Sequence, residues 1–194
     1  MFEDGFPKRF RQDVQLVCNK IIIKTYNNST IGQSEQNFSW ILLNNEIITF
    51  PYRIYYIDNF KNIDKDFTPI QEIIYHCIFS RCCDGFIREK HIRALLEIET
   101  PDWALPYIIK VCDEYVVEIL ELVYDYLKDI DTTKYKKICK KNLPLFIYGH
   151  SRMISYWNEF YRNRYFKYSQ YIGKRLYKEC FGYTRSMEKS SHFD

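Results

Sequence analysis

The strongest constraint on the fold is an internal repeat in the middle of the chain. Residues 69–130 read as two units offset by 29 residues, and each unit consists of a helix, a short break and a second helix. Cys83 and Asp84 in the first break recur as Cys112 and Asp113 in the second. The other matched pairs are Arg81 with Lys110, Phe86 with Tyr115, Ile87 with Val116 and Glu89 with Glu118. A lone helical hairpin cannot bury its apolar face, so the repeat predicts hairpins that stack on each other.

The first break and the helix after it resemble a HEAT-type repeat. The match consists of Asp84, the Ile-Arg pair at 87–88 and the Ala-Leu pair at 94–95. His91 stands where that pattern usually has a small residue, and Val117 replaces the arginine in the second unit. The resemblance implies an α-solenoid-like stack of helical hairpins over residues 69–130 and a binding role. It implies no particular partner.

Three polar residues of the repeat are interpreted as structural. Asp84 and Asp113 each precede a helix, where a carboxylate accepts hydrogen bonds from free backbone N–H groups. We therefore predict that both cap helices and that neither is a catalytic acid. In the HEAT-type repeats that this segment resembles, an arginine often bridges to an aspartate of the neighbouring unit. The resemblance thus implies a structural role for Arg88.

Residues 1–60 predict a small antiparallel β-sheet. The expected strands are residues 20–26, 38–43, 46–50 and 52–57, and residues 14–19 form either a short helix or a further strand. Asn44 and Asn45 separate two apolar runs and tolerate the positive φ of a tight hairpin turn. Residues 27–37 are polar and predict a loop, and residues 58–68 predict a charged linker. The fold class is therefore α+β, with this sheet followed by a mainly helical, HEAT-like stack. A small sheet joined to the segments 84–88 and 114–119 also resembles bacterial proteins of unassigned function.

Residues 131–185 are basic and aromatic, and they predict C-terminal helices that cap the repeat within one compact unit. Residues 1–130 carry 14 lysines and arginines against 20 acidic residues, whereas residues 131–194 carry 14 against 5. Such asymmetry indicates either an anionic partner or a basic cap packed on acidic helices. The possible binding surface consists of Lys134, Lys136, Lys137, Lys140, Lys141, Arg152, Arg162, Arg164, Lys167 and Arg175.

Composition excludes several classes of protein. A hydrophobic fraction of 46% and an aromatic fraction of 18% supply a real core, which disordered chains lack. Seven cysteines without regular spacing do not form a disulfide framework, so we expect free thiols in a reducing cytoplasm. No apolar run approaches the roughly 20 residues of a membrane span. We therefore expect no membrane partner.

The motifs of catalysis and cofactor binding do not appear in the sequence. His76, Cys77, Cys82 and Cys83 cluster near one predicted helix end, but their spacing fits no standard zinc pattern. The six glycines form neither of the common phosphate-binding loops. We therefore predict no catalytic, metal-binding or cofactor-binding residues.

The resulting hypothesis is a non-catalytic module for protein–protein interaction, such as an adaptor, an inhibitor or an immunity-type protein. The acidic repeat would suit a basic protein partner. The first alternative is nucleic-acid binding through the basic, aromatic C-terminal part, where cations contact phosphates and rings stack on bases. The second is a small enzyme with an unrecognised site. The sequence does not determine the oligomeric state.

Overall fold

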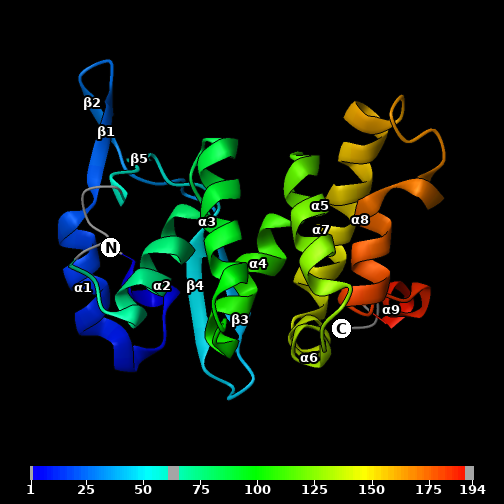
Figure 1. The fold of residues 1–194 in the computed structure, drawn as a ribbon, viewed down its shortest axis with the longest axis horizontal. Helices are drawn as coiled ribbons and strands as arrows, with labels where there is room; N and C mark the ends of the chain where they lie inside the picture. The colour runs from blue at the N-terminus through cyan, green and yellow to red at the C-terminus, as the bar shows by residue number, and fades with distance from the viewer. Residues whose placement is uncertain (1, 61–65, 191–194) are drawn as a thin grey trace. The chain divides into compact units, whose positions relative to one another are not determined.

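The computed structural model describes residues 2–60 and 66–190, and it has the α+β fold expected from the sequence (Figure 1). Residues 61–65 of the expected linker lie outside this description. The chain divides into two compact units, residues 1–107 and residues 108–194. The division falls inside the repeat segment 69–130, so its first hairpin belongs to unit 1 and its last helix to unit 2. The predicted stacking of the hairpins therefore stays a prediction.

Unit 1 contains two small antiparallel sheets, where the sequence predicted one. The strands are β1 (Ile22–Tyr26), β2 (Ser29–Ile31), β3 (Asn37–Ile41), β4 (Ile47–Pro51) and β5 (Tyr56–Ile57). One sheet has the order β2-β1-β5 and the other pairs β3 with β4. The predicted hairpin is confirmed, but its turn is longer than the expected two residues: the Leu42 N–H donates to the Glu46 carbonyl, and only Asn45 has a positive φ, of 67°. The turn joins β3 to β4, and these two strands form a sheet of their own.

Two further features of residues 1–60 complete the comparison with the prediction, one against it and one within it. The expected loop at 27–37 contains strand β2, because Asn27 and Asn28 adopt φ values of 47° and 63° and turn the chain back on β1. Helix α1 (Arg11–Lys20) covers residues 14–19, so the helix is the alternative that forms there, and it begins three residues earlier. Positive φ at consecutive residues is the requirement of a two-residue hairpin turn, and asparagine tolerates it.

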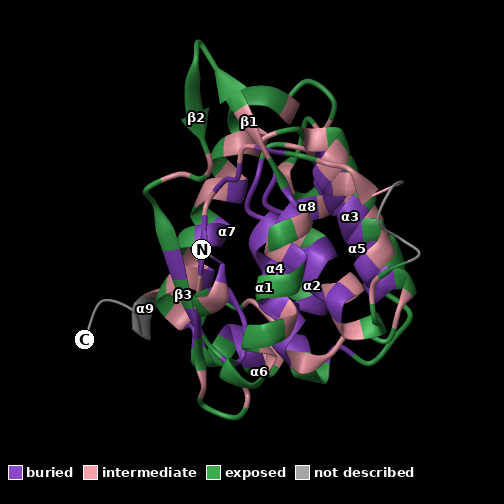
Figure 2. Cartoon of the chain, turned by 90° about the vertical axis from the view of Figure 1, so that its left-hand side faces the viewer, coloured by how far each residue is buried: buried purple, intermediate pink, exposed green. Residues whose placement is uncertain are grey.

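The β3–β4 hairpin packs one face into the core of unit 1. Phe38 and Trp40 are buried while their neighbours along β3 are exposed (Figure 2). From β4, Phe50 stacks on Tyr107 with ring centroids 4.1 Å apart. The Tyr107 hydroxyl donates a 2.7 Å hydrogen bond to the Gly5 carbonyl. Burying a side chain of this size contributes about 1.5–3 kcal/mol, so these rings hold the hairpin against the N-terminal segment.

The first helical hairpin of the repeat consists of α2 (Pro69–Phe79) and α3 (Gly85–Glu97). α2 begins as the sequence predicts, with a capping box between Thr68 and Gln71. The Asp84 carboxylate accepts hydrogen bonds from the backbone N–H groups of Phe86 and Ile87, which confirms it as the cap of α3. Between the helices, the buried Arg88 guanidinium donates to the Cys82 and Cys83 carbonyls at 2.8 and 3.1 Å. Arg88 thus closes the turn of its own hairpin.

Unit 2 is helical. After α4 (Leu105–Val111) its elements are α5 (Val117–Leu127), α6 (Thr133–Lys141), α7 (Leu143–Tyr156), α8 (Ile172–Arg175) and α9 (Arg185–Ser190). Two π-helical segments, Trp157–Tyr161 and Leu176–Cys180, extend α7 and α8. The predicted apolar face of α5 is confirmed, because Ile119, Leu120, Val123, Tyr124 and Leu127 are all buried. Among the described residues, no helix has the length and apolarity that crossing a membrane requires.

The cap prediction for Asp113 is wrong. α5 begins at Val117, and its cap position is Val116, whose side chain makes no capping hydrogen bond. The chain after Asp113 runs three further residues before the helix starts, so the carboxylate cannot reach the first free N–H groups. Asp113 is buried inside unit 2, where it forms an ion pair with Lys110.

Two substitutions of Asp84 test its role as the cap of α3. Replacing Asp84 with alanine removes the acceptor of two N–H groups and is expected to lower the free energy of unfolding by about 1 kcal/mol. Asp84→Asn keeps an acceptor oxygen and is expected to stay close to the wild type. Urea denaturation of the three proteins measures both values, and an equal loss in the two variants would contradict the capping role.

Candidate functional site

Four side chains spaced by four residues follow one face of α7 and its π-helical extension. They are Tyr148, Arg152, Tyr156 and Phe160. Tyr148 is 45% exposed and Phe160 is 61% exposed. The rings of Tyr156 and Phe160 lie 6.1 Å apart and nearly parallel. Exposing aromatic rings to water is unfavourable in free energy. Contiguous exposed patches of this kind commonly mark interaction sites.

Arg152 lies between the two tyrosines of this row. Its guanidinium carbon is 5.7 Å from the ring centre of Tyr148 and 5.6 Å from that of Tyr156. Its Nη2 donates a 3.1 Å hydrogen bond to the Tyr156 hydroxyl. A guanidinium over aromatic rings is attracted by their quadrupoles, by about 0.5–1 kcal/mol at exposed sites. The three side chains therefore hold each other in place before any partner binds.

Tyr115 joins the row from the turn before α5. It is 45% exposed, and its ring lies 6.1 Å from Tyr156 and 6.4 Å from Phe160. Tyr161 fixes this turn, since its hydroxyl accepts a 3.2 Å hydrogen bond from the Val117 N–H and donates to the Tyr115 carbonyl. The Tyr161 hydroxyl thus provides an acceptor for one of the N–H groups at the start of α5 that have no partner within the helix. We call Tyr115, Tyr148, Arg152, Tyr156 and Phe160 the aromatic–arginine surface.

Buried charges beneath the aromatic–arginine surface position it. Asp113 forms an ion pair with Lys110, and its Oδ1 lies 3.8 Å from Arg152 Nε. Burial raises the pKa of Asp113, and the Lys110 and Arg152 charges oppose this rise. Gly149 lets α7 approach, because a Cβ there would lie 3.2 Å from Asp113 Cβ and 3.1 Å from the Tyr177 hydroxyl. The carboxylate therefore ties the α4–α5 turn to the arginine of α7.

Several residues of the sequence-predicted binding surface are already paired within unit 2. Arg164 forms ion pairs with Glu118 and Glu121 of α5, at 3.9 and 2.9 Å. Arg175 pairs with Glu179 at 3.5 Å and donates to the Tyr124 hydroxyl. Arg162 donates to the Asn158 side chain at 3.2 Å, and Lys167 is exposed. The arginines thus meet acidic or polar groups of their own unit.

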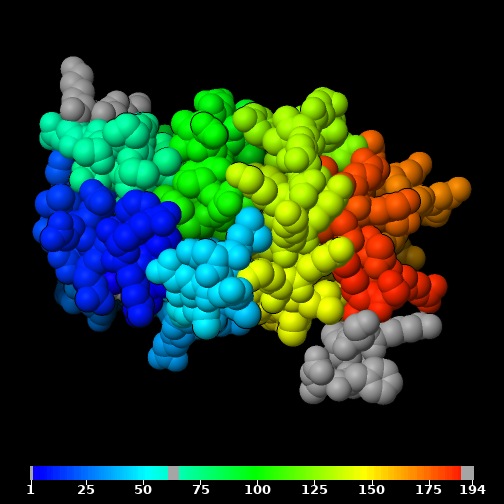
Figure 3. Space-filling model, turned by 90° about the horizontal axis from the view of Figure 1, so that it is seen from below, coloured from blue at the N-terminus to red at the C-terminus, as the bar shows by residue number. Residues whose placement is uncertain are grey.

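The lysines of the predicted surface form a separate set. Lys134, Lys137, Lys140 and Lys141 are exposed on α6, whereas Lys136 is half-buried. α6 is seen in yellow on the face drawn in Figure 3. The aromatic residue of this helix, Tyr135, is buried, so exposed rings do not alternate with these cations along α6. Of the ten predicted residues, Arg152 alone is part of the aromatic–arginine surface.

The four aromatic members of this surface are not among the residues predicted from the sequence to bind a partner. Their signal was the strict four-residue spacing from position 148 to position 160, which places side chains on one helix face. Aromatic residues at helical spacing more often belong to a core, as the buried Phe146 on the same helix does. Tyr115 carries no such signal, because only the tertiary fold brings the turn before α5 next to α7.

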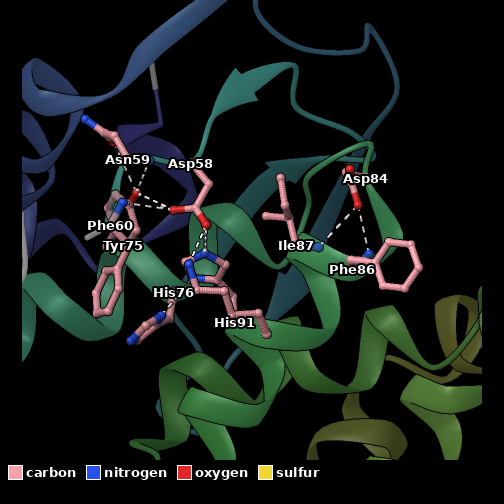
Figure 4. A network of polar contacts seen from close by, with 10 residues as sticks. Asp58, Asn59, Phe60, Tyr75, His76, Asp84, Phe86, Ile87 and His91 are labelled. Carbon is pink, nitrogen blue, oxygen red and sulfur yellow. Dashed lines mark hydrogen bonds and ion pairs between the residues drawn. The ribbon is translucent and has the colours of Figure 1, made fainter. Parts of the chain in front are cut away.

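A second polar cluster lies in unit 1, between β5, α2 and α3 (Figure 4). The Nδ1 atoms of His76 and His91 are 2.8 Å apart, so one ring donates a hydrogen bond to the other. His91 Nε2 lies 3.4 Å from Asp58, which also binds Lys90 at 2.6 Å and accepts from the Tyr75 hydroxyl at 3.0 Å. His91, the residue that departs from the HEAT-type pattern, thus has a partner on the other helix of its hairpin.

Burial determines the charge state of this cluster. Desolvation lowers the pKa of His76 to about 3, and the pKa of His91 is also lowered by desolvation, which Asp58 opposes. The Asp58 carboxyl is itself desolvated, but hydrogen bonds from His91 and Lys90 hold its pKa below the usual range. Both histidines are therefore neutral at pH 7. Within the described part of the chain, no group of three or more His, Cys, Asp or Glu side chains is arranged to hold a metal ion.

These shifts predict acid sensitivity of unit 1. The folded pKa of His76 lies below the unfolded value of about 6.5, so stability is present above pH 6.5 and is lost as pH falls below it. Between pH 7 and pH 5 the loss is about 2 kcal/mol for one such histidine. The contribution of Asp58 is lost only below about pH 3.8, outside this range.

Hydrogen exchange of the α2 and α3 amides at pH 7 and pH 5, compared at matched chemical exchange rates, measures this loss. The double variant His76→Gln/His91→Gln is expected to be less stable at pH 7 and to lose clearly less stability on acidification. His150→Gln is the control, because it removes a buried histidine of unit 2 and leaves this cluster intact. An unchanged pH dependence in the double variant would contradict the assignment.

The chain matches no family model, no curated protein and no solved structure in the three comparisons. Evidence for its function therefore comes from its own side chains.

Proposed function

We propose that this chain is a non-catalytic protein-binding module and that the aromatic–arginine surface of unit 2 contacts its partner. The observation that carries the proposal is the exposure of Tyr115, Tyr148 and Phe160 around an arginine that is already held in place. The partner is a folded protein that offers apolar and hydrogen-bonding groups to these side chains. An adaptor, an inhibitor or an immunity-type protein would each bind in this way.

The residue types support a protein partner. Tyrosine, tryptophan, phenylalanine and arginine are enriched at protein interfaces, and tyrosine and arginine are among the residues whose truncation costs most binding energy. Rigid rings lose little side-chain entropy on binding. Tyr156 and Arg152 are further restrained by their mutual hydrogen bond. They therefore lose less conformational entropy when a partner binds.

Nucleic acid is the less favoured partner because the arginines near the rings are matched by acids. Arg164 pairs with Glu118 and Glu121, and Arg152 lies beside Asp113. Phosphate binding would have to compete with these carboxylates. The exposed lysines of α6 are the feature that favours nucleic acid, and a salt-dependent association through them is the alternative outcome of the test.

We also propose that the hairpin of α2 and α3 is a HEAT-like unit. The Asp84 cap, the buried Arg88 in the inter-helix turn and the buried Ile92, Leu95 and Leu96 of α3 support this reading. A rigid hairpin of this kind suits a binding module, since it presents a fixed outer surface. The hairpin stabilises unit 1, and the residues that contact the partner lie in unit 2.

The test is affinity capture from native extract with the full chain as bait. We compare the wild type with Phe160→Ala, because truncating an exposed ring removes contact area and leaves the core intact. Truncating a hot-spot residue of an interface costs at least about 2 kcal/mol, which corresponds to about a 30-fold loss of affinity. We expect a defined protein to be captured by the wild type, with or without nuclease, and to be lost with Phe160→Ala.

Phe166→Ala is the matched control, since Phe166 is an exposed phenylalanine of the same unit that is not part of the aromatic–arginine surface. This variant is expected to capture the same protein as the wild type. Equal loss in the two variants would indicate general stickiness of exposed rings and would contradict the proposal. Loss of all bound material after nuclease treatment would assign the function to nucleic acid.

A further inference from the structure

A cleft in unit 2 lies on a different set of residues from the aromatic–arginine surface. It is lined by residues of α7, of α8 with its π-helical extension, of α9 and of the segments before α8 and α9, and its volume is about 660 Å³. Small-molecule sites commonly have volumes of 300–1,000 Å³. The lining residues are His150, Ile154, Tyr168, Lys174, Lys178, Tyr183, Thr184, Arg185 and Glu188. The cleft is thus large enough for a small ligand.

The inner part of the cleft is aromatic and ordered. His150 is buried, and its ring stacks on Tyr183 with centroids 3.6 Å apart. Its Nε2 lies 3.3 Å from the Tyr168 hydroxyl, while its Nδ1 has no hydrogen-bond partner among the described residues and lies 3.8 Å from Glu188. Burial lowers the pKa of His150 to about 4, so the ring is neutral at pH 7. A buried imidazole with a free nitrogen is unusual unless it serves a ligand or a water.

The mouth of the cleft carries excess positive charge. Lys174, Lys178 and Arg185 face one carboxylate, Glu188, which already accepts a hydrogen bond from the Tyr183 hydroxyl. Lys174 lies over the Tyr168 ring at 5.3 Å, and neither lysine forms an ion pair with a described residue. Three cations beside aromatic walls suit a ligand that combines a dianion with an apolar body, because each part then meets its complement.

We propose that this cleft binds a small organic phosphate with a planar ring. The phosphate would lie among Lys174, Lys178 and Arg185, and the ring would lie against Ile154, Tyr168 and Tyr183. A phosphate dianion matches the excess charge of the three cations better than a single carboxylate does. Mononucleotides and aryl phosphates belong to this chemical class. This site is independent of the protein-binding surface, so either can fail without the other.

Isothermal titration calorimetry of the full chain tests the site with phenyl phosphate and 5′-AMP as probes. Inorganic phosphate and phenol are the matching fragments. We expect at least one probe to bind saturably and more tightly than either fragment, and its affinity to fall with added salt. Lys174→Gln/Lys178→Gln keeps polar side chains and removes two charges, which is expected to weaken binding by about tenfold or more. Lys137→Gln/Lys140→Gln removes two exposed charges of α6 and is expected to bind as the wild type does.

Nuclear magnetic resonance locates the binding independently of these variants. The imidazole signals of His150, assigned by their absence in His150→Gln, are expected to shift on titration with the probe, while those of the buried His76 and His91 stay in place. Absence of saturable binding for both probes would overturn the proposal. So would equal weakening in the two double-lysine variants, or binding that leaves the His150 signals unchanged.

Discussion

The ion pair between Asp113 and Lys110 is the interaction on which unit 2 depends. Both side chains are almost completely buried, and a buried carboxylate without a cation would be strongly destabilising. The pair therefore forces the turn between α4 and α5 to stay closed. Because Asp113 also lies 3.8 Å from Arg152, the same carboxylate restrains the arginine of α7. The placement of the exposed rings around Arg152 follows from this internal charge.

Space as well as charge permits this arrangement. Gly149 lies opposite Asp113, where any side chain would meet Asp113 and Tyr177 at close to 3 Å. α7 can therefore approach the turn, and its outer face presents Tyr148, Arg152 and Tyr156 to solvent. Tyr161 completes the link by holding the Tyr115 turn from the π-helical segment, a helix form often found at functional sites. The exposed surface is thus supported by a buried layer directly beneath it.

Sequence reasoning predicted the features that depend on local chemistry. The Asn44–Asn45 turn, the Thr68 cap, the Asp84 cap and the apolar face of α5 each follow from neighbouring residues, and each is present. It failed where tertiary contacts decide. Asp113 matches Asp84 in the repeat, yet a cationic neighbour on α4 and the longer approach to α5 make it a buried ion-pair partner.

The candidate site was predicted only in part for the same reason. Arg152 was selected for its charge, whereas the exposed rings beside it have the composition of a core and are distinguished only by which face of α7 meets its neighbours. The His76–His91 contact joins two helices of one hairpin and could not be read from spacing alone. Residue types therefore predicted the α+β fold class, while the surface itself required the fold.

Site-specific photocrosslinking tests the central claim most directly. A photoreactive phenylalanine analogue placed at position 160 reports what touches the aromatic–arginine surface in living cells, and the same analogue at position 166 reports on an exposed ring outside it. The account predicts a discrete crosslinked protein from position 160 that is absent or much weaker from position 166. Equal crosslinking from the two positions, or crosslinks from position 160 to nucleic acid alone, would contradict it.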